Sequence, residues 1–187
     1  NGYLSPATPG APNGTSSLGV TLQHVDVSRD SGTFSDTLRI TLSSNEPNST
    51  IVFTLDGTIP TRNSPRFAAP LEISESTQVR ARVLELDHVL GPVKTASYVK
   101  VDAEVAEFSS HLPIMIVDNF GAGDIPNTGW NQTNTRIQQL PRQAANLMLF
   151  EADESGARLT SDADASSRIG IRVRGAFSST FSEPGYS

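Results

Sequence analysis

The chain contains no cysteine, and this absence excludes two kinds of chemistry. Without thiols there is no disulfide framework and no thiolate that could act as a nucleophile or a metal ligand. The lack of cysteine leaves secretion open. The chain also has no run of 18 apolar residues, so no segment predicts a membrane-spanning helix.

Basic residues are scarce as well. Fourteen Lys and Arg against 20 Asp and Glu give a formal net charge of -6. Nucleic-acid binding needs a basic surface for the phosphates, so we do not expect nucleic acid to be the main partner. The chain opens at Asn1 without a methionine or a signal peptide, and it ends at Ser187 soon after a strongly patterned strand. We therefore expect a mature or excised piece of a longer polypeptide.

Turn-forming residues, by contrast, are abundant, with 14 Gly and 12 Pro. This composition indicates short strands joined by turns rather than long helices. The clearest strand runs through Ile51, Phe53 and Leu55, which alternate with smaller or polar residues. It stops at Asp56-Gly57, because Asp bonds its own backbone and Gly adopts positive φ freely. We therefore interpret Asp56 as a turn residue and not as a catalytic acid.

Residues 19–101 consist of successive short strands, and they follow a Pro-, Gly- and Ser-rich linker at 1–18. The segments at 37–42 and 77–84 alternate most clearly. In the second of them Val79, Ala81 and Val83 share one face, while Arg80 and Arg82 lie on the other. Strands at this spacing, without a helical period, predict an immunoglobulin- or fibronectin-III-like β-sandwich. A connector follows at 102–112, where residues 103–108 could form one helical turn.

Several motifs of this region resemble the chitobiase/β-hexosaminidase C-terminal domain over residues 21–101. They are IVFTLDGTIPT at 51–61, Ser64, Pro70-Leu71, Ser76-Thr77 and Val79-Arg80-Ala81. Two positions depart from the family pattern: Phe53 stands where Tyr is usual, and Ile59 where an acidic or small residue is usual. The resemblance implies an immunoglobulin- or fibronectin-III-like accessory module of secreted enzymes, with no catalytic residues of its own.

Residues 113–187 have a different pattern and predict a β-rich partial second domain. Pro113–Asp118 is a nearly continuous apolar run, as expected of a strand covered on both faces. Further strands are predicted at 145–152 and 168–175, with a hairpin turn at 153–156 and a polar loop at 161–167. Little chain remains to cover the apolar run. We expect its cover to come from the rest of the parent polypeptide, a cleaved companion chain or the sandwich domain.

This second region is similar to the start of the CotH spore-coat-kinase-like domain over residues 110–187. The motifs that carry the similarity are LPIMIVD at 112–118, FEAD at 150–153 and GIRVRGAFSS at 170–179. SEPG at 182–185 stands where the family commonly has Lys. The resemblance implies a kinase whose catalytic residues lie beyond Ser187, so no catalytic residue is predicted within this chain.

Two groups of side chains are candidates for binding. Arg168, Arg172 and Arg174 share one parity, and their guanidinium groups could grip a phosphate or a carboxylate. They could equally form the polar face of an edge strand, paired with acidic neighbours. Trp130 and Phe120 lie in a Gly- and Asn-rich loop, where they could stack on a sugar ring or simply anchor the loop.

Asp162 and Asp164 have the alternate spacing of calcium-binding loops. The Gly and the distal Glu that would complete an EF-hand are missing, so solvated loop carboxylates are the alternative interpretation. No other cofactor is predicted. His24, His88 and His111 lie far apart in sequence, at spacings that support neither a zinc site nor a Ser/His/Asp triad.

The leading hypothesis is a non-catalytic spacer and binding module of a large secreted or cell-surface bacterial protein. Two alternatives stay open: the N-terminal part of a CotH-like kinase, and a carbohydrate-binding module. The expected partners are the remainder of the parent polypeptide or a companion chain, together with carbohydrate or a cell-surface protein.

Overall fold

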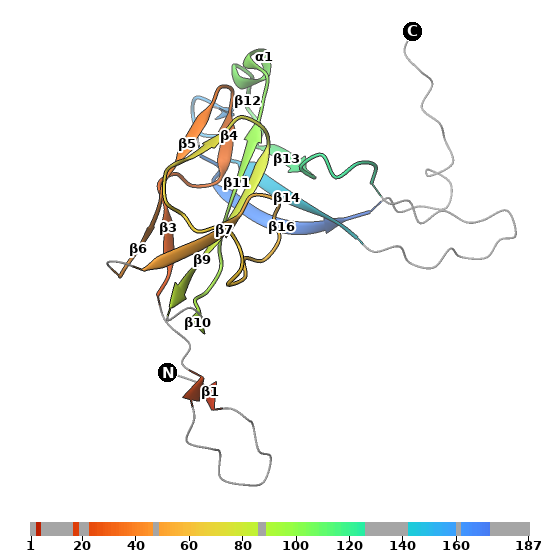
Figure 1. The fold of residues 1–187 in the computed structure, drawn as a ribbon. Coiled ribbons are helices and arrows are strands. Elements are labelled where there is room, and N and C mark those ends of the chain that lie inside the picture. The colour runs from red at the N-terminus through yellow and green to blue at the C-terminus, as the bar shows by residue number, and fades with distance from the viewer. Residues whose placement is uncertain are drawn as a thin grey trace, which may run out of the picture. The chain divides into compact units, whose positions relative to one another are not determined.

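The computed structural model of the chain describes residues 3–4, 17–18, 23–46, 49–85, 89–125, 142–159 and 162–172 (Figure 1). Contacts divide the chain into two compact units, and each is described by itself. The first unit is Asn1–Phe108 with Arg158–Ala163, and the second is Ser109–Ala157 with Asp164–Ser187. The sequence predicted two continuous domains, at 19–101 and 113–187. It did not predict that residues 158–163, which we call the tie segment, belong to the first unit.

The first unit is built from short strands, as its turn-rich composition predicts. Its largest sheet has the order β10-β9-β11-β4, and β7 also pairs with β9; separate pairs are β1 with β2, β3 with β6, and β5 with β8. All of these pairs are antiparallel except β11 with β4, which is parallel. The bounds are β1 Tyr3–Leu4, β2 Ser17–Leu18, β3 Val25–Val27, β4 Gly32–Phe34, β5 Leu38–Ile40, β6 Leu42–Ser44, β7 Thr50–Thr54, β8 Leu71–Ile73, β9 Thr77–Glu85, β10 Val89–Leu90 and β11 Lys94–Lys100.

The core of this unit collects one face of each strand. Val79, Ala81 and Val83 of β9 are at most 1% exposed and pack with Ile40 and Tyr98, as the alternation predicted. The cluster also includes side chains from β3, β6, β7 and β8, so the main sheet encloses it together with the pairs β3–β6 and β5–β8. A mainly β fold with several sheets, consistent with the predicted sandwich, is therefore confirmed.

The strand predicted at 37–42 is divided at Thr41. Its first part, β5, pairs with β8, while its second part, β6, pairs with β3. The backbone of Thr41 bonds instead to Ser28, whose hydroxyl accepts from Thr41 N at 2.9 Å and whose N–H donates to Thr41 O at 3.0 Å. Alternation continues through such a change of partner, and for this reason the sequence pattern did not reveal it.

The turn after β7 has the predicted chemistry. Asp56 Oδ1 accepts from the Thr58 hydroxyl at 2.6 Å and from Thr58 N at 3.0 Å, and these bonds lower the pKa of Asp56. Gly57 has a φ of +73°, and a Cβ there would lie 2.8 Å from Gln78 Oε1. Arg80 Nη1 donates to Gly57 O at 3.2 Å, so a side chain of β9 fixes the position of the turn. The structural role predicted for Asp56 is confirmed.

The connector after β11 contains a single helical turn, α1, at Ala103–Ala106. This agrees with the one turn predicted within residues 103–108. Among the described residues, no helix is long and apolar enough to cross a membrane.

The second unit contains a three-stranded antiparallel sheet in the order β13-β14-β16 and the pair β12 with β15. The described strands are β12 Ser109–Ser110, β13 Ile114–Asp118, β14 Gln143–Phe150, β15 Ala157–Arg158 and β16 Ala165–Ile171. A turn is present at 153–156 as predicted, but it does not join a hairpin, because β14 pairs with β13 and β16 whereas β15 pairs with β12. Gly156 N donates to Asp153 O at 3.0 Å, and Gly156 has a φ of +91° with Ser110 O close to where a Cβ would stand.

The strand predicted at 168–175 begins three residues earlier, at Ala165, and its described part ends at Ile171. Ala165, Ser166 and Ser167 pair with Leu149, Met148 and Leu147. The sequence predicted a polar loop here. The first residues of β16 are exposed, so they are polar or small and show no apolar alternation.

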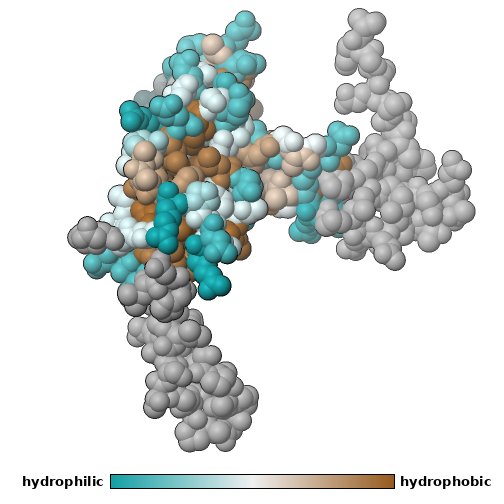
Figure 2. Space-filling model, viewed as in Figure 1, coloured by the Kyte–Doolittle hydropathy of each residue, from teal (hydrophilic) through white to brown (hydrophobic). Residues whose placement is uncertain are grey.

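The described residues of the second unit do not cover β13 on both faces. Met115 is 62% exposed and Val117 48%, while Ile114 and Ile116 of the other face are half-buried. Figure 2 shows white to brown residues over the region where Figure 1 labels β13 and β14. The strand has one paired neighbour, β14, among the described residues. The source of any further cover stays a prediction.

Candidate binding site

A hollow of about 270 Å³ lies in the first unit, beside the turn that joins β4 to β5. We call it the β4–β5 pocket. Its walls come from four places in the chain: the segment before β4, the stretch from β4 to the start of β5, the connector that follows β11, and the tie segment. All of them belong to the first unit, so the pocket is a feature of that unit alone.

The β4–β5 turn is positioned by pairing on both sides. β4 runs parallel to β11, with Thr33 opposite Val99 and Phe34 opposite Lys100. Val101 N extends this pairing by donating to Phe34 O at 2.9 Å. β5 then pairs with β8, so the intervening residues 35–37 must turn sharply above the end of the sheet. The turn forms one rim of the pocket.

Aliphatic and aromatic side chains line the inner part of the pocket. Phe34 is 8% exposed and Leu159 4%, and both are held firmly by the surrounding structure. Leu38, Val101 and Ala106 complete this apolar surface. Such a surface favours contact with C–H groups of a ligand.

The rim is polar. Ser35, Asp36 and Thr37 are exposed, and none of the three side chains hydrogen-bonds to another described residue. Two hydroxyls can each donate and accept, and the carboxylate can accept from two donors at once. The rim therefore presents hydrogen-bonding groups that are available to a ligand.

Arg29 also lines the pocket and is already engaged. Its Nε lies 2.9 Å from Asp162 Oδ1, and its Nη2 donates to Thr33 O at 2.8 Å. The Arg29 carbonyl accepts from the buried Tyr98 hydroxyl at 2.6 Å. Burial raises the pKa of Tyr98 well above its ordinary value, and the charges of Asp30 and Asp162 add to this effect while Arg29 opposes it. Arg29 is thus a fixed wall rather than a mobile cation.

The tie segment is bonded along the edge of β4. The buried Thr33 hydroxyl donates to Leu159 O, and Ala163 N donates to Ser31 O at 2.8 Å. Gly32 and Asp162 form an isolated antiparallel bridge. Together with the Arg29–Asp162 ion pair, these bonds seat Leu159 in the pocket wall.

The two aspartates considered for calcium have partners within the protein. Asp162 pairs with Arg29 in the first unit, whereas Asp164 of the second unit accepts from Glu151 N at 2.8 Å. No group of three or more His, Cys, Asp or Glu that could hold a metal ion occurs among the described residues. Calcium binding stays a prediction.

The three arginines proposed for anion binding are only partly described. Arg168 lies on the exposed end of β16, in register with Asn146 of β14. Arg172 follows the last residue of that strand and is half-buried. Arg174 lies outside the described residues. A row of three guanidinium groups therefore stays a prediction.

Of the two aromatic residues proposed to stack on a sugar, Trp130 also lies outside the described residues. Phe120 is half-buried with a φ of +53° and donates its N–H to Asp118 Oδ1 at 2.6 Å. The loop around it is tied to β14, because Gln143 Nε2 donates to Ala122 O at 2.9 Å and Gln143 Oε1 accepts from Asn119 at the same distance. These bonds fit the loop-anchor interpretation of Phe120, while sugar stacking stays a prediction.

Sequence reasoning missed the β4–β5 pocket. Residues 35–37 have the composition of an ordinary turn, and the pocket depends on Leu159, which is distant in sequence. Only the polar run Ser35-Asp36-Thr37 between two alternating segments could have drawn attention to the rim.

The first unit is thus a β-rich module of sandwich type. Within it, residues 29–95 match the family model of the chitobiase/beta-hexosaminidase C-terminal domain. The resemblance predicted for residues 21–101 is confirmed over that range. No curated protein and no solved structure matches the chain. The CotH-like resemblance of residues 110–187 stays a prediction, and most of the motif at 170–179 lies outside the described residues.

Proposed function

We propose that this chain is a non-catalytic accessory module of a larger secreted or cell-surface protein, and that its first unit associates with carbohydrate. The observation that carries the proposal is the match of residues 29–95 to a domain named for its place at the C-terminus of chitobiase and β-hexosaminidase. Enzymes with these names act on amino-sugar glycosides. A module that accompanies them has a natural role in holding or spacing the enzyme near its polymer.

The construction of the first unit supports a scaffolding role. The turn at 56–60 and the turn at Gly91 are both fastened to β9 by arginine side chains. Arg82 Nε donates to Gly91 O at 2.9 Å and its Nη1 to Pro60 O at 3.3 Å, while Arg80 reaches Gly57 O. Turns held in this way resist local opening, which suits a spacer between other domains.

Retention on insoluble polysaccharide tests the proposal. The 187-residue chain is passed over chitin, cellulose and peptidoglycan, and heat-unfolded chain serves as the control. We expect the folded chain to be retained on at least one matrix and released by soluble oligosaccharide of the same kind. Passage through all three matrices at the rate of the control would contradict carbohydrate association.

The non-catalytic part of the proposal has its own test. The same preparation is incubated with a chromogenic N-acetyl-β-glucosaminide. We expect no release of the chromophore above the rate without protein. Turnover that follows the chain through purification would contradict the assignment.

An alternative is that the chain is the N-terminal part of a CotH-like kinase. It is favoured by one observation: the motifs that carry this resemblance include β13, the last residue of β14 and the last two residues of β16, and these three strands form one sheet. Protein that extends beyond Ser187, incubated with magnesium and labelled ATP, should then label itself or a partner. Absence of transfer would count against this alternative.

A further inference from the structure

We propose that the β4–β5 pocket is the sugar-binding site of the first unit and that it takes one hexopyranose ring without negative charge. This inference rests on the proposed association with carbohydrate and adds the site and the ligand class. It is carried by the combination of an apolar inner surface with a rim of unengaged hydroxyl and carboxylate groups.

The size of the pocket limits the ligand. Its volume of about 270 Å³ falls below the roughly 300 Å³ at which sites for drug-sized ligands begin. An oligosaccharide could therefore place only one of its rings in the pocket. A chain end or a single side branch is the part of a polysaccharide that fits.

The inner surface suits one face of a pyranose. The half-buried side chains of Leu38, Val101 and Ala106 offer the accessible aliphatic carbon, and the nearly buried Phe34 and Leu159 lie behind them. Axial C–H bonds make one face of a hexopyranose apolar, so burial of that face releases water from both surfaces. Phe34 and Leu159 are nearly fully buried, so they support this surface rather than receive the sugar themselves.

The rim suits the hydroxyl groups around the edge of the ring. The Asp36 carboxylate can accept from two neighbouring hydroxyls at once, and the Ser35 and Thr37 hydroxyls can donate or accept. Because the three are consecutive in one turn, they line a single side of the opening. None of the three side chains hydrogen-bonds to another described residue.

Charge disfavours an anionic ligand. The guanidinium of Arg29 is neutralised by Asp162 at 2.9 Å, which leaves the carboxylate of Asp36 as the unpaired charge at the pocket. An anionic sugar would meet that carboxylate without a free cation to offset it. A phosphate or sulfate ligand is disfavoured for the same reason.

Titration of the ¹⁵N-labelled 187-residue chain with monosaccharides tests the proposal. The probes are N-acetylglucosamine and glucose as neutral sugars, glucuronate as an anion and glucosamine as a cation. We expect saturable shifts of the amides at residues 35–38, 106 and 159 with at least one neutral sugar. Half-saturation should lie in the millimolar range, and glucuronate should bind at least about tenfold more weakly.

Two variants locate the site, and one serves as a matched control. Asp36→Ala should weaken binding of the neutral sugar at least about tenfold without unfolding, because Asp36 is exposed. Ala106→Trp should abolish binding by filling the pocket. Ala103→Trp places the same side chain on the same turn α1, at an exposed residue outside the pocket lining, and should bind like the unchanged chain.

The outcomes separate this inference from the proposed function. If polysaccharide retains the chain and both Asp36→Ala and Ala106→Trp are retained equally well, the pocket assignment is wrong and the proposed function stands. Binding of glucuronate as tight as that of the neutral sugars would also overturn the assignment, since the unpaired Asp36 carboxylate should repel an anion. If neither polysaccharide nor any neutral sugar binds, both proposals fail.

Discussion

Strand β9 of the first unit carries two arginines and is almost wholly buried, whereas β13 of the second unit is Ile-Met-Ile-Val-Asp and leaves alternate side chains exposed. β9 pairs with three strands, β7, β10 and β11, and it packs the core on one face. Its other face is covered by the turns that Arg80 and Arg82 bind. β13 pairs with β14 alone among the described residues.

The difference shows that burial in this protein follows the number of neighbouring segments more closely than side-chain polarity. An arginine can be buried where backbone carbonyls receive its N–H groups, because the desolvated donors are then satisfied. β13 stays half exposed because, among the described residues, fewer segments pack around it.

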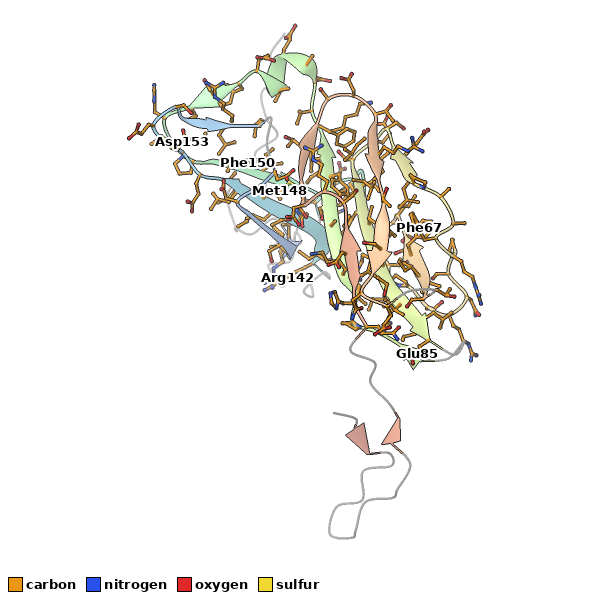
Figure 3. The ribbon with its side chains drawn as sticks, turned by 90° about the vertical axis from the view of Figure 1, so that its left-hand side faces the viewer. Phe67, Glu85, Arg142, Met148, Phe150 and Asp153 are labelled. Carbon is orange, nitrogen blue, oxygen red and sulfur yellow. The ribbon has the colours of Figure 1, made fainter. Side chains whose placement is uncertain are left out.

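The largest expected effect comes from the only two methionines of the chain. Met148 of β14 is fully buried, whereas Met115 of β13 is 62% exposed; Figure 3 labels Met148 and Phe150 along the same strand. Met148→Ala should lower the free energy of unfolding by about 2–5 kcal/mol. Met115→Ala should change it by no more than about 0.5 kcal/mol. Urea unfolding measures both.

The two methionines also allow a chemical test of how exposed each side chain is. Under mild peroxide, Met115 should be oxidised well before Met148, and mass spectrometry of proteolytic peptides separates the two. Equal protection of both sulfurs, or an equal loss of stability for both alanine variants, would mean that β13 is covered in solution. The contrast with β9 would then disappear.

The next effect concerns the arginines. Arg82→Met should lower the free energy of unfolding by about 1–3 kcal/mol, because it removes the donors to Gly91 O and Pro60 O. Arg39→Met, on the exposed side of β5, is the matched control and should cost no more than about 0.5 kcal/mol. Thermal and urea unfolding at neutral pH measure the two. Equal losses would argue against the interpretation that Arg82 fastens the two turns to β9.

A smaller effect is expected at Tyr98, and it depends on pH. Tyr98→Phe removes the 2.6 Å bond to Arg29 O and should cost about 1 kcal/mol at neutral pH. Since burial raises the pKa of Tyr98 in the folded state, the folded protein holds this proton more tightly than the unfolded chain. The resulting stabilisation is complete below the ordinary tyrosine pKa of 10.0 and is lost progressively as the pH rises above it.

Unfolding curves between pH 8 and 11, run in parallel on the two proteins, check this prediction. The unchanged chain should lose stability with rising pH more steeply than Tyr98→Phe. Parallel curves would show that the phenol ionises as freely in the folded state as in the unfolded one.

The smallest effect belongs to the tie segment. Asp162→Asn removes the ion pair with Arg29, whose side chains are 26% and 50% exposed. Such a pair contributes at most about 1 kcal/mol, and screening by salt reduces it further. We expect the variant and the unchanged chain to converge in stability at 1 M salt. A difference that persists there would assign Asp162 a role beyond charge.

Much of the first unit could be predicted because its strands bury one face and expose or bond the other. That arrangement produced the alternation through Val79, Ala81 and Val83, and the Asp56-Gly57 turn has a local chemistry that sequence reveals directly. The break at Thr41 could not be predicted, since a strand that changes partner keeps its alternation. The start of β16 was missed because its first residues are too exposed to leave an apolar pattern.

The candidate site was beyond sequence reasoning for a different reason. Ser35, Asp36 and Thr37 are ordinary turn residues until Leu159 is brought beside them. That placement rests on bonds such as the one between Arg29 and Asp162, which are 133 positions apart. No local pattern encodes a pairing at that distance.

The return of residues 158–163 to the first unit bears on the order of events during synthesis. Domains generally begin to fold from the N-terminus as the chain leaves the ribosome. Here the edge of β4 cannot receive its last neighbour until residue 163 has emerged, long after the other strands of that unit are available. A nascent chain arrested before that point should expose this edge to chaperones, and a gene fragment truncated at Phe108 would encode the same unfinished state permanently.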